Sequence, residues 1–392
     1  MRDAYIVSAC RTPIGRYWGA LKSVSAVQLG TRVVEAAIRR AGIPAEAVQE
    51  VIMGNVLSAG LGQNPARQTA LGAGIPVPVA AFTIDMVCGS SLKAVMLGGQ
   101  AIQVGDVEVV VAGGMESMSQ APFLLPRERK GPSSRQEAQD SMVHDGLWDA
   151  YGDYHMGCTA ELISEKYELT RCQQDEYALR SHTRAISAIA QGRLQDEIVP
   201  IEVPVEGSEP VLLDRDEGPR ENTSLEALSQ LKPVFKDHGL VTAGNSSQIS
   251  DGAAALTLLS EAALKHWEVR PMARIVASVT TGIEPSLIMM APVDAIHKVL
   301  ERAGWSDAEV DLYEVNEAFA AQSVALIKEV PLDPSRLNVH GGAVALGHPI
   351  GASGARVLVT LLYALRSRNC SRGVASLCLG GGNAVAIAIE LV

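Results

Sequence analysis

Short runs rich in valine, isoleucine and alanine alternate along most of this chain with segments whose apolar residues recur at helical spacing. The strand-like runs are residues 4–9, 81–84, 109–114, 273–278, 376–379 and 386–392. The helix-like segments include residues 92–97 and 175–191. Short apolar strands that alternate with amphipathic helices are typical of an α/β fold in which helices cover both faces of a sheet.

The same series of elements occurs twice. The matched pairs, in the same order and at nearly constant separation, are 4–9 with 273–278, 40–42 with 302–304, Asn55 with Asn316, 89–91 with 351–353, and 109–114 with 376–382. This order predicts two related α/β halves. We place the N-terminal half at residues 1–118, completed by residues 245–269, and the C-terminal half at residues 270–392.

Residues 119–244 separate the two halves and lack the repeat. The segment begins with a charge-rich stretch and continues through helix-forming residues such as 175–191. An insertion of this length is more than a plain loop, so we expect an inserted loop domain that acts as a lid or a binding module.

The composition narrows the functional class. Of the 392 residues, 47% are hydrophobic and 20% are charged, as in globular enzymes, and the formal charge of −11 argues against general nucleic-acid binding. We expect no membrane span and no signal peptide, because no apolar run has the required length or flanks. Six cysteines without C-x-x-C spacing predict reduced thiols in the cytoplasm, and argue against a disulfide framework or a zinc ribbon.

Cys88 is the first candidate for chemistry. It lies in the segment Asp-Met-Val-Cys-Gly-Ser-Ser (85–91), between a strand-like run and a helix-like segment. A thiol at the start of a helix is close to the positive end of the helix dipole, which predicts a pKa below its usual value of about 8.5 and a reactive nucleophile. The alternative is that Cys88 is a small buried hydrophobic residue.

Three further side chains stand at turns. His348, beside glycines and a proline, is a candidate base for the thiol, and Cys378, before three glycines, is a second thiol that could move protons. Asn316 follows a short apolar strand and could be a helix cap or an amide that polarises a carbonyl group or orients a water. Each could instead be purely structural. The glycine clusters lack the G-x-G-x-x-G spacing of a dinucleotide site.

These motifs resemble those of the thiolase family from end to end. The segment 85–91, Asn-Glu-Ala-Phe-Ala at 316–320, Gly-Gly at 341–342 followed by Gly-His-Pro at 347–349, and Cys-Leu-Gly-Gly-Gly at 378–382 stand in the family's order. The resemblance implies an α/β fold, a five-layer α/β/α/β/α sandwich of two repeated halves, with an inserted loop domain over the coenzyme A site. It also implies a tight dimer and an arm at residues 124–136 that couples two dimers into a homotetramer.

The resemblance further implies how the chemistry is divided. Cys88 would be the acylated nucleophile, and His348 the base that activates it. Cys378 would move the α-proton of a second acetyl-CoA. Asn316, through a water, and His348 resemble the oxyanion hole for the enolate, whereas the backbone N–H groups of Cys88 and Gly380 resemble the hole for the tetrahedral intermediate of acyl transfer.

A larger set matches positions that bind coenzyme A or substrate in the family. These residues are Leu147, His155, Met156, Arg220, Leu231, Phe235, Ala243, Ser247, Ala318 and Phe319. His155 and Met156 belong to a Tyr-His-Met-Gly segment that is similar to one in short-chain acetoacetyl-CoA thiolases. Ser91, His340 and Ser246 depart from residues common in the family, which leaves the fine substrate preference open.

The activity implied by the resemblance is that of an acetyl-CoA C-acetyltransferase, which condenses two acetyl-CoA molecules reversibly to acetoacetyl-CoA and coenzyme A through an acetyl-cysteine. The alternatives are a broad or longer-chain 3-ketoacyl-CoA thiolase of fatty-acid degradation and a non-catalytic thiolase-like binding protein. No cofactor or metal is expected, because the coenzyme A thioester is itself the substrate. The expected partners are acetyl-CoA, acetoacetyl-CoA and CoA, with no nucleic acid and no membrane.

Overall fold

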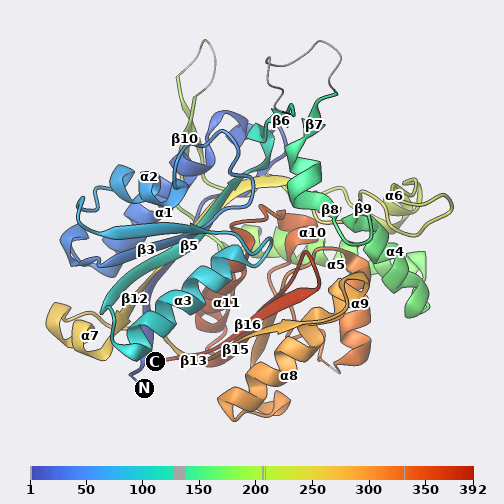
Figure 1. Cartoon of the computed structure of the whole chain (residues 1–392). Coiled ribbons are helices and arrows are strands. Elements are labelled where there is room, and N and C mark those ends of the chain that lie inside the picture. The colour runs from blue at the N-terminus through green and yellow to red at the C-terminus, as the bar shows by residue number, and fades with distance from the viewer. Residues whose placement is uncertain (1, 127–136, 205–206, 208, 331) are drawn as a thin grey trace.

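A computed structural model describes residues 2–126, 137–204, 207, 209–330 and 332–392 (Figure 1). Its main sheet runs in the order β14-β15-β16-β13-β1-β12-β5-β3-β4, with β2 (Gly15–Arg16) beside β12. The strands of the N-terminal half are β1 (Ala4–Arg11), β3 (Glu50–Gly54), β4 (Ala80–Ile84), β5 (Val109–Ser117) and β12 (Ser250–Ser260). Those of the C-terminal half are β13 (Ala273–Gly282), β14 (Leu312–Val315), β15 (Arg372–Leu379) and β16 (Asn383–Leu391).

The two halves repeat the same strand order. If the strands of each half are numbered in the order in which they occur along the chain, those of the N-terminal half lie in the order 3-2-4-5-1 across the sheet. The strands of the C-terminal half follow the same order, and an isolated bridge at Leu337 takes the place of strand 3. Both copies also carry a register shift at the same point, between Ile6 and Ser8 and between Ile275 and Ala277. The halves meet where β1 pairs with β13.

Helices form three layers around the two halves of the sheet. The outer helices are α1 (Ala26–Ala41), α2 (Pro65–Gly72) and α7 (Glu261–Trp267) on the N-terminal half, and α8 (Ala291–Ala303) on the C-terminal half. The helices α3 (Ser90–Val104) and α11 (Ser353–Ser367) lie in the middle and contact strands of both halves. The predicted α/β sandwich of five layers is therefore confirmed.

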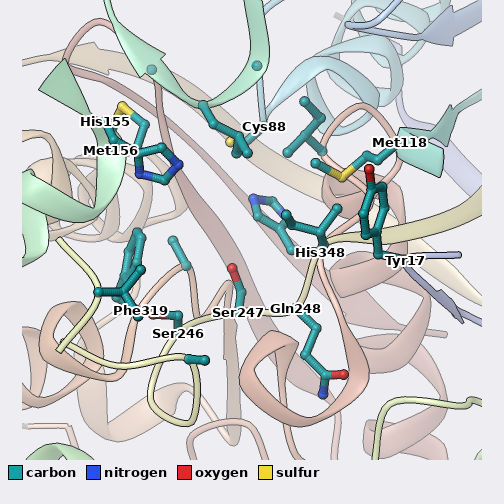
Figure 2. Close-up of a pocket in the computed structure, with 18 of the residues that line it drawn as sticks. Tyr17, Cys88, Met118, His155, Met156, Ser246, Ser247, Gln248, Phe319 and His348 are labelled. Atoms are coloured by element: carbon teal, nitrogen blue, oxygen red, sulfur yellow. The ribbon is translucent and has the colours of Figure 1, made fainter. Parts of the chain in front are cut away.

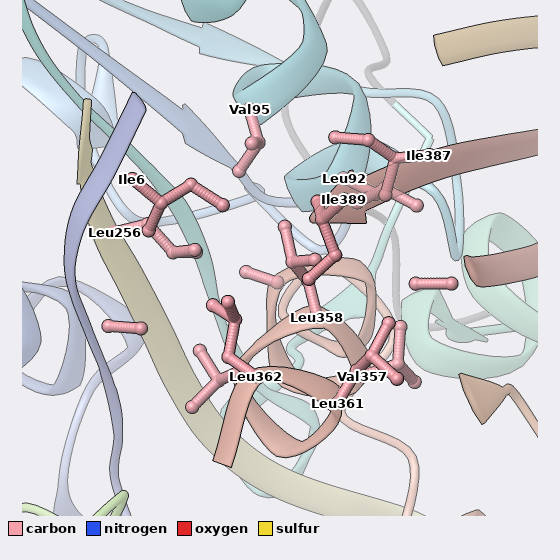
Figure 3. Close-up of a cluster of buried hydrophobic side chains, with 14 of the residues drawn as sticks. Ile6, Leu92, Val95, Leu256, Val357, Leu358, Leu361, Leu362, Ile387 and Ile389 are labelled. Carbon is pink, nitrogen blue, oxygen red and sulfur yellow. The ribbon is translucent and has the colours of Figure 1, made fainter. Parts of the chain in front are cut away.

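The central layer is held by one large apolar cluster (Figure 3). Leu92 and Val95 of α3 and Leu358 and Leu362 of α11 are all buried within it. Strand residues such as Ile389 complete the cluster. Since each fully buried aliphatic side chain contributes roughly 1.5–3 kcal/mol, this cluster fixes the relative position of the two helices, and both helices begin at the site described below.

Smaller elements lie between β5 and β12, within the segment predicted to be an inserted loop domain. They are β6 (Phe123–Leu124), β7 (Gln139–Asp140), β8 (Trp148–Asp149), β9 (Tyr154–His155), α4 (Met156–Lys166), α5 (Arg171–Ala190), β10 (Ile201–Val203), β11 (Val211–Leu213) and α6 (Leu225–Ser229). In the C-terminal half, α9 (Ala320–Glu329) packs on α4 and α5, and α10 (Ala343–Leu346) packs on α5.

The predicted limits of the inserted loop domain, at 118/119 and 244/245, stay a prediction. None of the helices built from described residues is long and apolar enough to cross a membrane.

Candidate active site

The candidate residues lie where strands of both halves end. Cys88 follows β4, Asn316 follows β14, and Gly380 follows β15, while His348 lies in the loop that leads into α11. Cys88 and His348 thus each precede one of the two central helices, α3 and α11. The two halves of the repeat therefore each bring one reactive side chain to the same end of the core.

A strained turn presents Cys88. Val87 has a φ of 47°, which is uncommon for a β-branched residue. The Ser90 hydroxyl donates to the Val87 carbonyl at 2.6 Å and accepts from the Met86 N–H at 2.8 Å, and the Val87 N–H donates to Asp85 Oδ1 at 2.8 Å. These bonds hold the turn in place, so that the thiol is fixed at the point where the chain enters α3.

Burial dominates the acidity of this thiol. It raises the pKa of Cys88 to about 12, although the backbone N–H groups of Cys88 and Gly380 favour the thiolate. The expectation of a lowered pKa is therefore wrong, because α3 begins only at Ser90 and desolvation outweighs the two N–H groups. The same two N–H groups are the pair that the resemblance to thiolases implies as an oxyanion hole.

His348 is held in one tautomer. Its Nδ1 lies 2.6 Å from the Ser353 hydroxyl, which itself donates to the Pro349 carbonyl at 2.9 Å. Because the hydroxyl proton is engaged there, Nδ1–H must be the donor and Nε2 keeps its lone pair as an acceptor. Burial and the positive charge of Arg356 lower the pKa of His348 to about 3, so the resting imidazole is neutral.

Asn316 lies behind this imidazole. Its Nδ2 is 3.4 Å from His348 Nε2, and its buried Oδ1 has no hydrogen-bond partner among the described residues. The next residue, Glu317, accepts hydrogen bonds from Tyr177, Ser181 and Asn338 at 2.6–3.0 Å. This buried network fixes the segment that carries Asn316.

Cys378 ends β15 and is almost completely buried. Burial and the neighbouring Cys88 both raise its pKa. The chain then turns through Gly381 and Gly382, which have φ values of 83° and 86° that favour glycine. A side chain at Gly380 would approach Val87 at 3.2 Å, so the glycine allows the two turns to pack closely.

These groups open into one cavity of about 750 Å³. Of the predicted residues, Cys88, His348, Cys378, Gly380, Leu147, His155, Met156, Arg220, Phe235, Ala243, Ser247, Ala318 and Phe319 line it. Figure 2 shows Cys88 and His348 in the middle of the lining, His155 and Phe319 to one side, and Tyr17 and Met118 to the other. Asn316 and Leu231 do not line it. Asn316 is buried behind His348, and Leu231 is partly exposed on the loop after α6.

Aromatic rings build the wall farther from the reactive groups. Phe235 stacks on His155 with ring centroids 4.7 Å apart and meets Phe319 edge-on at 6.1 Å. The Cβ of a larger residue at Gly157 would come within 2.3 Å of the Phe235 ring. The wall is thus apolar, preformed and closely packed, as small-molecule sites usually are.

Sequence reasoning missed several lining residues. They are Arg16, Tyr17, Trp18, Gly19, Val87, Met118, Gly146, Val234, Ser246, Gln248, Ile249, Ile288, Met289 and Ile350. Ile350 could have been found from its place two residues after His348. Tyr17 and Trp18 carry no such signal, because only the fold brings this turn to the cavity. Across the described part of the chain, no three histidine, cysteine, aspartate or glutamate side chains are grouped to bind a metal ion.

Comparisons with known proteins agree with this architecture. Residues 4–262 match the family model described as thiolase, N-terminal domain, and residues 269–391 match thiolase, C-terminal domain. An acetyl-CoA acetyltransferase of Pseudomonas aeruginosa is 51% identical over 99% of both chains, and a probable acetyl-CoA acetyltransferase of Escherichia coli K12 is 52% identical over 100% of this chain and 99% of its own. The crystal structure of the Bacillus anthracis acetyl-CoA acetyltransferase superposes with a TM-score of 0.97 at 44% identity, covering 100% and 99% of the chains. An Ascaris suum thiolase solved in complex with coenzyme A gives 0.93 at 44%, over the full length of both.

Proposed function

The chain belongs to the thiolase family, and from this premise we propose that it is an acetyl-CoA C-acetyltransferase. It would condense two acetyl-CoA molecules to acetoacetyl-CoA and free coenzyme A, and catalyse the reverse cleavage. The observation that carries the proposal is the convergence of Cys88, His348 and Cys378 on one cavity. The alternative of a longer-chain 3-ketoacyl-CoA thiolase is not favoured by the acetyltransferase relatives.

In the first step, His348 Nε2 takes the Cys88 proton while the sulfur attacks the thioester carbonyl carbon. The negative charge of the tetrahedral intermediate would be stabilised by the N–H groups of Cys88 and Gly380, which already face the sulfur. The carbon–sulfur bond to coenzyme A then breaks, and the proton passes from Nε2 to the leaving thiolate. The step exchanges one thioester for another, so this transfer is reversible.

In the second step, the Cys378 thiol passes its proton to His348 Nε2, and the resulting thiolate takes a proton from the methyl group of a second acetyl-CoA. The enolate oxygen would be stabilised by the N–H that His348 Nε2 now carries and, through a water, by Asn316, whose amide lies 3.4 Å from the imidazole. The enolate carbon attacks the acetyl-Cys88 carbonyl carbon, and cleavage of that thioester releases acetoacetyl-CoA and the thiolate of Cys88, which takes the proton back from Nε2. Two thiols with different neighbours can serve as nucleophile and as base.

Coenzyme A would lie along the aromatic wall. The rings of His155, Phe235 and Phe319 offer apolar surface, and Arg220 places a cation in the lining of a protein whose formal charge is −11.

We propose that no bound cofactor takes part, because thiol and imidazole groups suffice for this chemistry. We also propose a cytoplasmic homotetramer, and an inserted loop domain at residues 119–244 that contributes to coenzyme A binding.

The test is acetoacetyl-CoA cleavage by free coenzyme A, compared with cleavage of 3-ketoacyl-CoA chains of C10 or longer. A strong preference for C4 supports the proposal, whereas a preference for the long chains favours the alternative. Radiolabelled acetyl-CoA should label Cys88 with one acetyl group per chain. Cys88→Ala should lose both the label and the turnover, and substantial acetyl exchange in this variant would contradict the assignment.

A further inference from the structure

A buried ion pair joins β14, which ends just before Asn316, to α11, which begins at Ser353. Arg356 Nη1 of α11 is 3.0 Å from Glu314 Oε1 of β14, and both side chains are only 2% exposed. Two of the guanidinium nitrogens, Nε and Nη2, have no partner among the described residues. Burial of an incompletely paired charge is costly, so the structure retains this arginine in spite of its effect on stability.

The Glu314–Arg356 pair and the proposed base, His348, both connect the end of β14 to α11. Glu314 and Asn316 are two residues apart at the end of β14, and therefore point to the same side. Ser353 and Arg356 are three residues apart on α11, and therefore share one helix face. One link runs from Asn316 through His348 to Ser353, and the second, next to it, is the Glu314–Arg356 pair.

The positive charge acts on the imidazole. Burial and the positive charge of Arg356 together lower the pKa of His348, and burial raises the pKa of Glu314, an effect that the guanidinium at 3.0 Å opposes. The carboxylate pairs with one guanidinium nitrogen and leaves Nε and Nη2 unpaired among the described residues, so it compensates the positive charge only in part. The other groups around His348 are the thiols of Cys88 and Cys378, the amide of Asn316, the hydroxyl of Ser353 and, through the Gly351 N–H, the carboxyl group of Glu116.

We propose that Arg356, anchored by Glu314, is a positioning residue that makes the His348 imidazolium release its proton to the leaving thiolate. This role rests on the acyl transfer proposed above. A nearby cation destabilises the imidazolium, so the resting pair stays as thiol and neutral imidazole. When the Cys88 proton has moved to Nε2 during attack, the same cation favours its onward transfer to the coenzyme A sulfur as the carbon–sulfur bond breaks.

The test uses Arg356→Met, which removes the charge, and Arg356→Lys, which keeps it. Alkylation of Cys88 by iodoacetamide, followed by peptide mass spectrometry, measures the thiolate without any acetyl transfer. We expect Arg356→Met to alkylate about tenfold faster at pH 7, because a rise of one unit in the His348 pKa makes proton transfer from Cys88 tenfold more favourable. Acetyl transfer should nevertheless slow, and Arg356→Lys should resemble the wild type in both measurements.

Slower or unchanged alkylation in Arg356→Met would overturn the proposal, since a purely structural role predicts no gain in thiolate. Arg11→Met is the matched control, because Arg11 is equally buried and ion-paired to Glu197 and Asp216. It should lose stability without faster alkylation.

If Arg356→Met does not fold, Glu314→Gln is measured in its place. It leaves the cation uncompensated, so alkylation must slow, and an unchanged rate overturns the proposal. Absence of acetyl labelling together with faster alkylation would contradict only the proposed function.

Discussion

The Ser91 hydroxyl accepts a hydrogen bond of 2.8 Å from the Ala355 N–H, which joins the first turn of α3 to the first turn of α11. Next to it, a Cβ at Gly354 would come within 2.4 Å of the Leu92 nitrogen and 3.0 Å of Ser91 Oγ. The two helices that follow Cys88 and His348 therefore touch backbone to backbone. This contact sets the separation of the thiol from the imidazole.

Gly354→Ala should disturb that contact. The added methyl group meets backbone atoms that cannot move without shifting α3, so we expect a loss of about 1–3 kcal/mol in the free energy of unfolding, together with a loss of acetyl transfer. Gly99→Ala is the control, because its methyl group would meet the flexible end of Ile275 at 3.3 Å and the Ala4 Cβ at an ordinary 3.9 Å. Urea denaturation of both variants checks the prediction. Equal effects at the two glycines would contradict it.

Ser353→Ala should release the imidazole of His348. Without the 2.6 Å contact to the hydroxyl, Nδ1–H is no longer fixed and the ring can adopt the wrong tautomer. We expect the rate of Cys88 acetylation to fall by roughly 10- to 100-fold, with little change in KM for acetyl-CoA. Ser164→Ala is the control, because Ser164 is buried and its hydroxyl also donates to the carbonyl four residues earlier. If both variants lost acetylation equally, the tautomer argument would fail.

Cys378→Ser should separate the two chemical steps. A hydroxyl group has a much higher pKa than a thiol, so the ionised form that takes the α-proton hardly forms, and condensation should fall by about 100-fold or more. Acetylation of Cys88 requires no α-proton transfer and should largely survive. Single-turnover labelling and steady-state condensation measure the two steps. If acetylation and condensation fell in parallel, Cys88 and Cys378 would not act separately as nucleophile and base.

Glu116 should make stability depend on pH. Its buried carboxyl group accepts hydrogen bonds from Asn55, Val56, Leu57 and Gly351, and burial raises its pKa from the usual 4.5 to about 7. Between these values the folded chain keeps a proton that the unfolded chain has released. The free energy of unfolding should therefore fall as the pH rises, by at most about 1.4 kcal/mol per pH unit for this group.

Glu116→Gln removes this titration and should make the slope of the unfolding free energy less negative between pH 5 and pH 7. Exposed Glu46→Gln is the control and should keep the wild-type slope. Chemical denaturation at several pH values measures both. A slope in Glu116→Gln equal to that of the wild type would show that Glu116 is not the group that retains the proton.

Much of the fold could be predicted because the repeat is visible in local patterns of apolar residues and glycines. Apolar runs and glycine-ended helices at residues 40–42 and 302–304 appear twice in order, and both helices end in a left-handed glycine. The side-chain environments could not be predicted in the same way. The acidity of Cys88 depends on burial by distant segments, and the Glu314–Arg356 pair and the place of Trp18 at the cavity arise only when both halves are assembled. Local sequence indicates a helix start but carries no information on desolvation.

The charge-rich stretch at residues 124–136 is predicted to be an arm that joins dimers into a tetramer. Residues 127–136 lie outside the described residues. At the base of the stretch, β6 pairs with β7, and Phe123 and Leu125 are 68% and 50% exposed. Exposed apolar side chains at the start of such a segment are suited to an interface, because burying them against another subunit removes apolar surface from water. A solvated loop is the alternative.

Deletion of residues 126–136 should therefore convert a tetramer into a dimer that keeps its activity, because the proposed reactive groups all lie outside the deleted segment. Light scattering measures the mass in solution, and the acetoacetyl-CoA cleavage rate reports on the site. In a control variant, a glycine-serine linker of equal length replaces the segment, so that the connection between β6 and β7 is not shortened. This variant should also be a dimer. An unchanged tetramer after deletion, or a wild-type protein that is itself only a dimer, would rule out the arm.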